Sequence, residues 1–124
     1  MARVLIASED TSWADLLGST VNAEGHEAVF ATNGRDAYER ALETRPQMIF
    51  VDMVLPVYSG FELCRLLRAD PDISPDVPIV LTGATAPRSR QIEEAGASAH
   101  IMKTVSATEL REILVEHLSP HRAK

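Results

Sequence analysis

Four residues whose side chains suit metal or phosphoryl chemistry each follow a short apolar run. They are Glu9, Asp52, Thr82 and Lys103. Carboxylates are ligands that Mg²⁺ prefers, while an ammonium and a hydroxyl suit the oxygens of a phosphoryl group. A carboxylate beside a metal ion and an ammonium is also a competent phosphoryl acceptor, because phosphoryl transfer depends mostly on positioning and charge neutralisation. These residue types predict magnesium-dependent phosphoryl chemistry wherever the fold brings them together.

Asp52 is the best defined of the four, because the sequence around it fixes its setting. The run Met48-Ile49-Phe50-Val51 is uniformly apolar, which is typical of a strand buried on both faces of a parallel sheet. Pro56 and Gly60 break the chain soon afterwards. We therefore expect Asp52 at the point where a buried strand surfaces, and open parallel sheets bind their ligands outside such strand ends.

Apolar runs alternate with amphipathic segments along the whole chain. The sequence predicts strands over 3–8, 27–31, 48–52, 78–82 and 99–102. It predicts helices over 12–24, 35–44, 60–68, 88–95 and from 106 to a stop at Pro120. Five strand–helix repeats indicate right-handed parallel crossovers and a three-layer α/β domain. The length suits the flavodoxin-like strand order 2-1-3-4-5, although periodicity alone allows other orders.

Local patterns predict where some of these helices begin. Ser12 with Asp15, and Ser106 with Glu109, have the spacing of a capping box. Pro87 suits an early position of the fourth helix, because proline there loses no helical hydrogen bond.

Length and composition describe one ordinary globular domain. Of the 124 residues, 45% are hydrophobic and 24% are charged, which is enough for a real core. We predict a single domain over 1–124, with a core of about 2–119 and a frayed tail over 120–124.

Charge and cysteine content exclude several classes of function. The net charge of −6 argues against direct nucleic-acid binding, which needs a basic surface. No apolar run approaches the roughly 20 residues of a membrane span, and the N-terminus has no signal-peptide pattern. The single Cys64 excludes an internal disulfide, so we expect a protein of the reducing cytoplasm.

Each candidate residue also has an ordinary structural explanation. A carboxylate after a strand is often a helix cap, Thr82 suits a strand by propensity, and Lys103 by itself is most simply a solvated loop residue. In a parallel sheet, however, the carboxyl ends of the strands share one edge. Four such residues at four corresponding strand ends are much less easily accidental.

The sequence around Asp52 resembles the receiver domain of two-component response regulators. The most specific part is Asp52 followed by Pro56 at +4, Gly60 at +8 and then Phe61-Glu62-Leu63. Residues 45–52 are also similar to the usual approach of this family to its acceptor aspartate.

The resemblance covers essentially residues 2–119. Thr82 lies 30 residues after Asp52, and Lys103 lies 51 residues after it. Each motif alone is weak, but their combination is specific.

The resemblance implies a role for each matching residue. Asp52 would accept a phosphoryl group from a phosphohistidine on a sensor histidine kinase or a phosphotransfer protein. The carboxylates of Glu9 and Asp52, with the backbone carbonyl of Val54, would hold Mg²⁺. Thr82 and Lys103 would each bind a phosphoryl oxygen. The chain would be a phosphoacceptor, at most autocatalytic, rather than an enzyme.

The resemblance also implies a switch and an output surface. Thr82 would move inward on activation, and His100 occupies the aromatic switch position, although it is equally simply explained as a partly exposed ring. The fourth helix, fifth strand and fifth helix would form a face for a homodimer or an effector.

The acids at the end of the first strand depart from the family pattern. The family usually has two adjacent acids there, where this register gives Ser8-Glu9. A shifted register would make Glu9-Asp10 the pair, with Asp10 as a further metal ligand. With Ser8 in place of the first acid we expect weaker Mg²⁺ binding.

Two later positions depart as well. Thr104 stands where the family has a cis proline, and a cis bond at a non-proline residue costs about 3 kcal/mol, so we expect a trans bond. Val54 offers no group to orient an attacking water, so we predict a long-lived phosphoryl state.

Two other functions remain open on the sequence. An enzyme of the haloacid-dehalogenase type also uses an aspartate nucleophile with Mg²⁺, but it needs a second acid where Val54 stands. A pseudo-receiver would use the same fold as a non-phosphorylated interaction module, and Ser8 and Thr104 are compatible with it.

Overall fold

The computed structural model describes residues 1–118, in which five strands alternate with five helices. The strands are β1 Arg3–Ala7, β2 Glu27–Ala31, β3 Met48–Asp52, β4 Ile79–Gly83 and β5 Ala99–Met102. The helices are α1 Thr11–Ala23, α2 Gly34–Thr44, α3 Gly60–Ala69, α4 Ser89–Ala95 and α5 Ala107–Leu118. The predicted alternation is confirmed, with element ends shifted by one or two residues.

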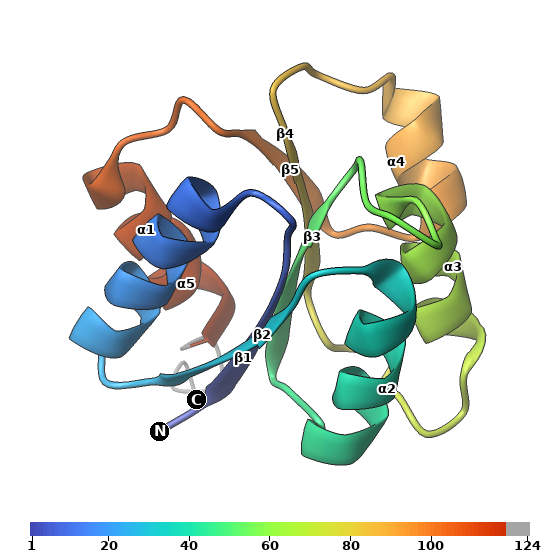
Figure 1. Ribbon diagram of the computed structural model, residues 1–124, viewed down its shortest axis with the longest axis horizontal. Coiled ribbons are helices and arrows are strands. Elements are labelled where there is room, and N and C mark those ends of the chain that lie inside the picture. The colour runs from blue at the N-terminus through green and yellow to red at the C-terminus, as the bar shows by residue number, and fades with distance from the viewer. Residues whose placement is uncertain (119–124) are drawn as a thin grey trace.

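All neighbouring strands are parallel, in the order β2-β1-β3-β4-β5. The predicted flavodoxin-like order is therefore confirmed. Helices α1 and α5 cover one face of the sheet, and α2, α3 and α4 cover the other (Figure 1). The strand order reverses between β1 and β3, and this switch point is where open α/β sheets leave a crevice for ligands.

The central strands are buried because helices cover both faces of the sheet. Every residue of β3 and of β4 is buried, as their uniformly apolar composition predicts. Alternate residues of β1 enter different cores: Val4 and Ile6 face α1 and α5, while Leu5 and Ala7 face the other layer. Because both faces of the central strands are covered, only the residues at the ends of these strands can reach a ligand.

Two predicted helix starts are wrong. Asp10 rather than Ser12 is the N-cap of α1, and its side chain accepts a hydrogen bond from the Trp13 amide at 3.2 Å. Aspartate is as good an N-cap as serine, and it comes first after β1. Helix α4 begins at Ser89, so Pro87 lies outside it.

The loop after β3 is held close under the end of the strand. A Cβ at Gly60 would lie 2.1 Å from the carbonyl oxygen of Asp52, so only glycine allows this approach of α3. Ser59 and Glu62 form a capping box that begins α3 there. The second predicted capping box, Ser106 with Glu109, is confirmed by reciprocal hydrogen bonds of 2.9 and 3.1 Å.

Two further expectations concern the backbone and the chain end. No cis peptide bond occurs among the residues described, so the trans bond predicted between Lys103 and Thr104 is confirmed. Within residues 1–118, no helix has the length and apolar content to cross a membrane. The predicted stop at Pro120 and the tail over 120–124 lie outside the described residues.

Candidate functional site

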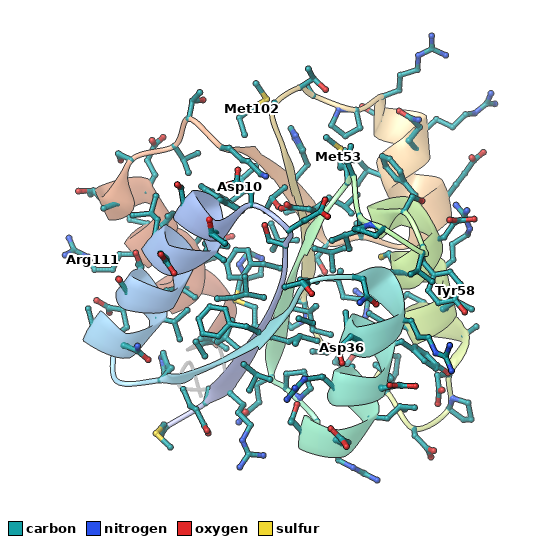
Figure 2. The ribbon with its side chains drawn as sticks, viewed as in Figure 1. Asp10, Asp36, Met53, Tyr58, Met102 and Arg111 are labelled. Atoms are coloured by element: carbon teal, nitrogen blue, oxygen red, sulfur yellow. The ribbon has the colours of Figure 1, made fainter. Side chains whose placement is uncertain are left out.

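The register of the sheet gathers polar residues at its carboxyl edge. Asp52 ends β3 and pairs with Thr82 of β4, while Ser8 follows Ala7, the β1 partner of Val51. Asp10, Met53 and Met102, which follow or end three different strands, lie toward this same edge (Figure 2).

Asp52 is a buried carboxylate whose two oxygens are both hydrogen-bonded by side chains. Its exposed fraction is 4%. The Thr82 hydroxyl donates to Oδ1 at 2.5 Å, and the Ser8 hydroxyl donates to Oδ2 at 2.7 Å. The Lys103 ammonium also donates to Oδ2, at 3.0 Å. A buried charge is tolerated only when it is paired and hydrogen-bonded, and here one cation and two hydroxyls do both.

Lys103 is shared between two carboxylates. Its Nζ lies 3.0 Å from Asp52 Oδ2 and 3.2 Å from Asp10 Oδ2, and it lies 6.0 Å from the centroid of the Trp13 ring. Burial lowers the pKa of Lys103, but the hydrogen bonds and charges of Asp52 and Asp10 outweigh it and raise the pKa overall. The Trp13 backbone N–H and Lys103 hold the pKa of Asp10 below its usual value. The ammonium therefore stays charged at neutral pH.

Of the residues that the sequence singled out, Asp52, Thr82 and Lys103 meet at one point. Glu9 is exposed, and within residues 1–118 its carboxylate makes no hydrogen bond or ion pair. Val54 is 83% exposed. The structure thus joins the acceptor candidate to the hydroxyl and the ammonium, while the predicted metal ligand Glu9 stands apart from this network.

The sequence did not predict that Ser8 contacts Asp52 or that Asp10 contacts Lys103. Sequence reasoning treated Ser8 as a lost acid, whereas its hydroxyl binds Asp52. It named Asp10 only as a possible metal ligand, which stays a prediction, and did not indicate that Asp10 caps α1 and binds Lys103. A signal for the Asp10 cap was present, because aspartate is a preferred N-cap residue and Asp10 precedes Ser12 in the connection after β1.

His100 lies in β5 opposite Leu81 and is half-buried. Its Nε2 is buried and has no hydrogen-bond partner within the described part of the chain. The switch role assigned to His100 stays a prediction.

The donor set fits a hydrated Mg²⁺ better than a metal ion enclosed by protein ligands. Asp10 and Asp52 already converge on one positive charge, the Lys103 ammonium. Within residues 1–118, no group of three His, Cys, Asp or Glu side chains is arranged to hold a metal. Mg²⁺ suits such a site because it keeps several waters and needs only one or two carboxylates.

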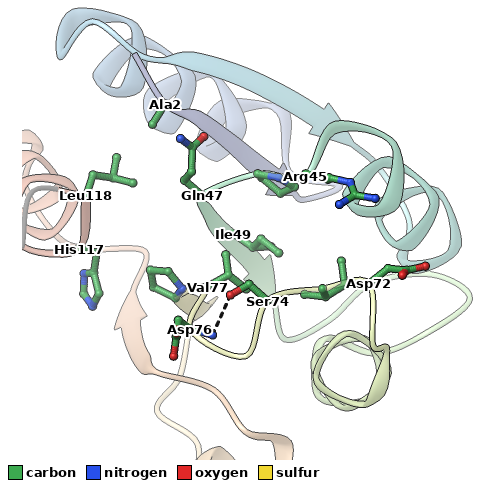
Figure 3. Close-up of a pocket in the computed structure, with 13 residues that line it drawn as sticks. Ala2, Arg45, Gln47, Ile49, Asp72, Ser74, Asp76, Val77, His117 and Leu118 are labelled. Carbon is green, nitrogen blue, oxygen red and sulfur yellow. Dashed lines mark hydrogen bonds between the residues drawn. The ribbon is translucent and has the colours of Figure 1, made fainter. Parts of the chain in front are cut away.

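A separate hollow of about 460 Å³ opens at the opposite, amino edge of the sheet (Figure 3). Arg45, Gln47, Asp76 and His117 are among the residues that line it. These polar groups come from loops and from the end of α5, and none of them belongs to the Asp52 network.

The fold and the edge residues together define a flavodoxin-like α/β protein with one buried aspartate at its switch point. Residues 4–115 match the family described as the response regulator receiver domain. The chain belongs to this family.

This chain matches different shares of the lengths of its relatives. The DNA-binding response regulator MtrA of Mycobacterium tuberculosis is 33% identical over 110 residues, which is 87% of this chain and 46% of MtrA. The chain thus spans about half the length of that relative. The polar-differentiation response regulator DivK of Brucella anthropi is 28% identical over 117 residues, covering 93% of this chain and 94% of DivK.

Solved structures share the fold closely. The CheY-like receiver domain protein of Methanospirillum hungatei superposes with a TM-score of 0.88 at 25% identity, covering 99% of this chain and 98% of that one. The receiver domain of the sensor histidine kinase PA1611 of Pseudomonas aeruginosa has a TM-score of 0.84 at 23% identity, over 94% of this chain and 97% of that one. That structure is described with a magnesium ion in its active site cleft.

Proposed function

We propose that this chain is a phosphoryl-accepting receiver domain whose acceptor is Asp52. The donor would be a phosphohistidine on a sensor histidine kinase or a phosphotransfer protein. One observation carries the proposal: a buried carboxylate has an ammonium and two hydroxyls within hydrogen-bond distance. These are the groups that the oxygens of a phosphoryl group need as it arrives.

In the proposed reaction, an Asp52 oxygen attacks phosphorus while the bond from phosphorus to the histidine nitrogen breaks. Lys103 and the Thr82 hydroxyl, which now bind the carboxylate oxygens, would turn to the phosphoryl oxygens. Transfer then depends on positioning and on charge neutralisation rather than on proton transfer by the protein.

Mg²⁺ would neutralise part of the phosphoryl charge when it is bound. We propose that Asp52, Glu9 and the Val54 carbonyl hold it, with Asp10 as a further carboxylate at the same edge. PA1611, which shares the fold, is described with magnesium in its cleft.

The switch would begin at Thr82 and be completed by His100. Phosphorylation adds charge and acceptor oxygens at the carboxyl edge, and these would draw the Thr82 hydroxyl from the Asp52 carboxylate to a phosphoryl oxygen. His100 follows in our proposal because its unpartnered, buried Nε2 gives the ring no hydrogen bond to lose. A near-complete switch from 1:99 to 99:1 would need about 5.5 kcal/mol of differential interaction.

The output would leave through α4, β5 and α5, toward a second copy or an effector. MtrA, by its name, binds DNA. We propose that the single domain over 1–124 does not, because its net charge is −6.

Incubation with Mg²⁺ and acetyl phosphate tests the acceptor role. We expect a mass increase of one phosphoryl group in the wild type and none in Asp52→Asn. Asp36→Asn changes a carboxylate of α2 that pairs with Arg40 rather than with the Asp52 network, and this variant should still gain the mass.

A pseudo-receiver is the second candidate, and the Ser8 contact favours it. The Ser8 hydroxyl occupies Asp52 Oδ2 at 2.7 Å, beside the ammonium that already neutralises the carboxylate. Absence of a mass increase with every donor, in protein that is folded, would support this candidate instead.

The lifetime of the phosphoryl group is set in part by Val54. Its side chain is exposed and apolar, so it cannot orient a water for attack on phosphorus. We expect the phosphorylated protein to persist well beyond seconds, and Val54→Asn to shorten its lifetime several-fold. Decay of the wild type within seconds would contradict this proposal.

A further inference from the structure

The carboxylate of Asp10 makes two contacts at once, one from each oxygen. Oδ1 accepts the backbone N–H of Trp13 at 3.2 Å and so caps α1. Oδ2 accepts from the Lys103 ammonium at 3.2 Å. The side chain is 45% exposed, so neither contact is forced on it by burial. The cap fixes the carboxylate, and the second oxygen is left to face Lys103.

Lys103 needs such a partner because its side chain is long and flexible. A single ion pair of a lysine at a surface contributes little stability, since ordering the long side chain costs entropy. Here the ammonium lies between two carboxylates, at 3.0 Å from Asp52 and 3.2 Å from Asp10, and its side chain is 23% exposed. Two anchors on different elements, β3 and the start of α1, define its position where one would not.

We propose that Asp10 is a positioning residue for Lys103. The carboxylate that caps α1 holds the ammonium beside Asp52, so the acceptor and the first helix share one positive charge. The inference rests on the proposed function, because it says how the group that receives the phosphoryl oxygens is kept ready. Asp10 acts through Lys103 and need not touch the phosphoryl group.

Loss of the Asp10 charge should therefore slow phosphoryl acceptance even when Mg²⁺ is saturating. A displacement of a reacting group by about 1 Å costs up to about 100-fold in rate. Because Asp52 alone still attracts Lys103, we expect a smaller effect, a rate lowered roughly 5- to 20-fold.

Two substitutions separate the cap from the charge. Asp10→Asn keeps an oxygen that caps α1, since Asn and Asp are equally good N-caps, but it has no charge for Lys103. Asp10→Glu keeps the charge, while its longer side chain is a poorer cap. We expect Asp10→Asn to keep the thermal midpoint of the wild type and lose rate. Asp10→Glu should lose stability and retain most of the rate. If Asp10 is only a cap, Asp10→Asn will keep the rate of the wild type as well as its thermal midpoint, and that result would overturn the proposal.

Asn33→Ser is the matched control. Asn33 caps α2 in the same way, by accepting from the Asp36 amide at 2.8 Å, and serine caps equally well. This variant should match the wild type in rate and in thermal midpoint. A rate loss as large as that of Asp10→Asn would mean that cap changes in general slow the reaction, and it would overturn the proposal.

A second measurement needs no phosphoryl transfer. The chain has only two lysines, Lys103 and Lys124, so their ammonium signals are simple to separate by NMR with ¹⁵N-labelled lysine. We expect solvent exchange of the Lys103 ammonium to be several-fold faster in Asp10→Asn than in the wild type. Unchanged exchange would overturn the inference. If the wild type accepts no phosphoryl group while exchange does accelerate, the proposed function fails and the positioning role stands.

Discussion

The two edges of the sheet use polar residues in opposite ways. At the carboxyl edge, side chains from three strand ends converge on Asp52, and a helix cap, Asp10, binds one of them, Lys103. At the amino edge, polar side chains bind backbone atoms of nearby loops: Gln47 accepts from the Arg3 amide at 2.8 Å, and Arg68 donates to the Val77 carbonyl at 2.7 Å. A hollow of about 460 Å³ opens at the amino edge (Figure 3), and side-chain pairs there, such as Arg3 with Glu27, are exposed and do not surround a buried charge.

The difference is that side chains at the carboxyl edge converge on one buried charge, which makes this edge the better candidate for a functional site. Polar groups at the amino edge satisfy the backbone of connections that cannot be buried unpaired. Those at the carboxyl edge bind one another around a single buried charge, which is costly to desolvate, so its presence there favours a functional role. Substitutions at the amino edge should therefore change stability, and those at the carboxyl edge should change binding and transfer.

The largest effect on stability is expected at Arg68, whose guanidinium binds carbonyls of several connections at the amino edge. It also donates to the Gly96 carbonyl at 2.7 Å and to the Pro75 carbonyl at 3.3 Å, so Arg68→Ala would leave three carbonyls without this charged donor. Hydrogen bonds to charged groups contribute about 1.5–3 kcal/mol each, so we expect a loss of about 2–3 kcal/mol in the free energy of unfolding by urea. Arg65→Ala, an exposed position on the same helix, should change it by less than about 0.5 kcal/mol. Equal losses of unfolding free energy in Arg68→Ala and Arg65→Ala would contradict the stabilising role of the Arg68 hydrogen bonds.

The next effect concerns the affinity for Mg²⁺ at the carboxyl edge. Ser8→Asp restores an acid beside Asp52, and we expect about tenfold tighter binding, equivalent to about 1.4 kcal/mol, in a titration followed by Trp13 fluorescence. Ser74→Asp adds the same charge at the amino edge and should leave the affinity unchanged. Affinity that does not improve in Ser8→Asp would remove Ser8 as the cause of weak binding.

Within residues 1–118, each edge also has one non-glycine residue with a left-handed backbone conformation. The two conformations should differ in how much they lower the stability of the protein. Val57, in the loop after β3, has φ 75°, and Arg45, at the end of α2, has φ 48°. A β-branched residue is a genuine outlier there, whereas Asn adopts this conformation more readily. We expect Val57→Asn to raise the free energy of unfolding by about 1 kcal/mol, and Arg45→Asn to raise it by less. A larger gain at Arg45 would show that the Val57 loop is not strained.

The smallest effect is expected at His117, which lines the amino-edge hollow. Its Nδ1 lies 2.9 Å from the Ile113 carbonyl of its own helix, so nothing at the carboxyl edge depends on it. His117→Ala should leave phosphoryl acceptance unchanged and shift the free energy of unfolding by no more than about 0.5 kcal/mol. A fall in the acceptance rate would show that the edges are coupled.

The sequence alone indicated the alternating, parallel α/β architecture and the acceptor candidate. Uniform apolar runs such as 48–51 occur where both faces of a strand are covered, so they predicted parallel strands and placed Asp52 at a strand end. Because all strand ends of a parallel sheet share one edge, Thr82 and Lys103 could be assigned to the same place as Asp52. These inferences use periodicity and order along the chain, which local residues carry.

Only the tertiary structure decided which side chains after β1 reach Asp52. Ser8, Glu9 and Asp10 are consecutive, and periodicity stops where the strand stops, so no pattern says which of them turns inward. The register of β1 against β3 sets Ser8 beside Asp52, and the start of α1 fixes Asp10 through the Trp13 amide. The direction of a side chain in a short connection depends on the elements that it joins, and those meet only in the folded molecule.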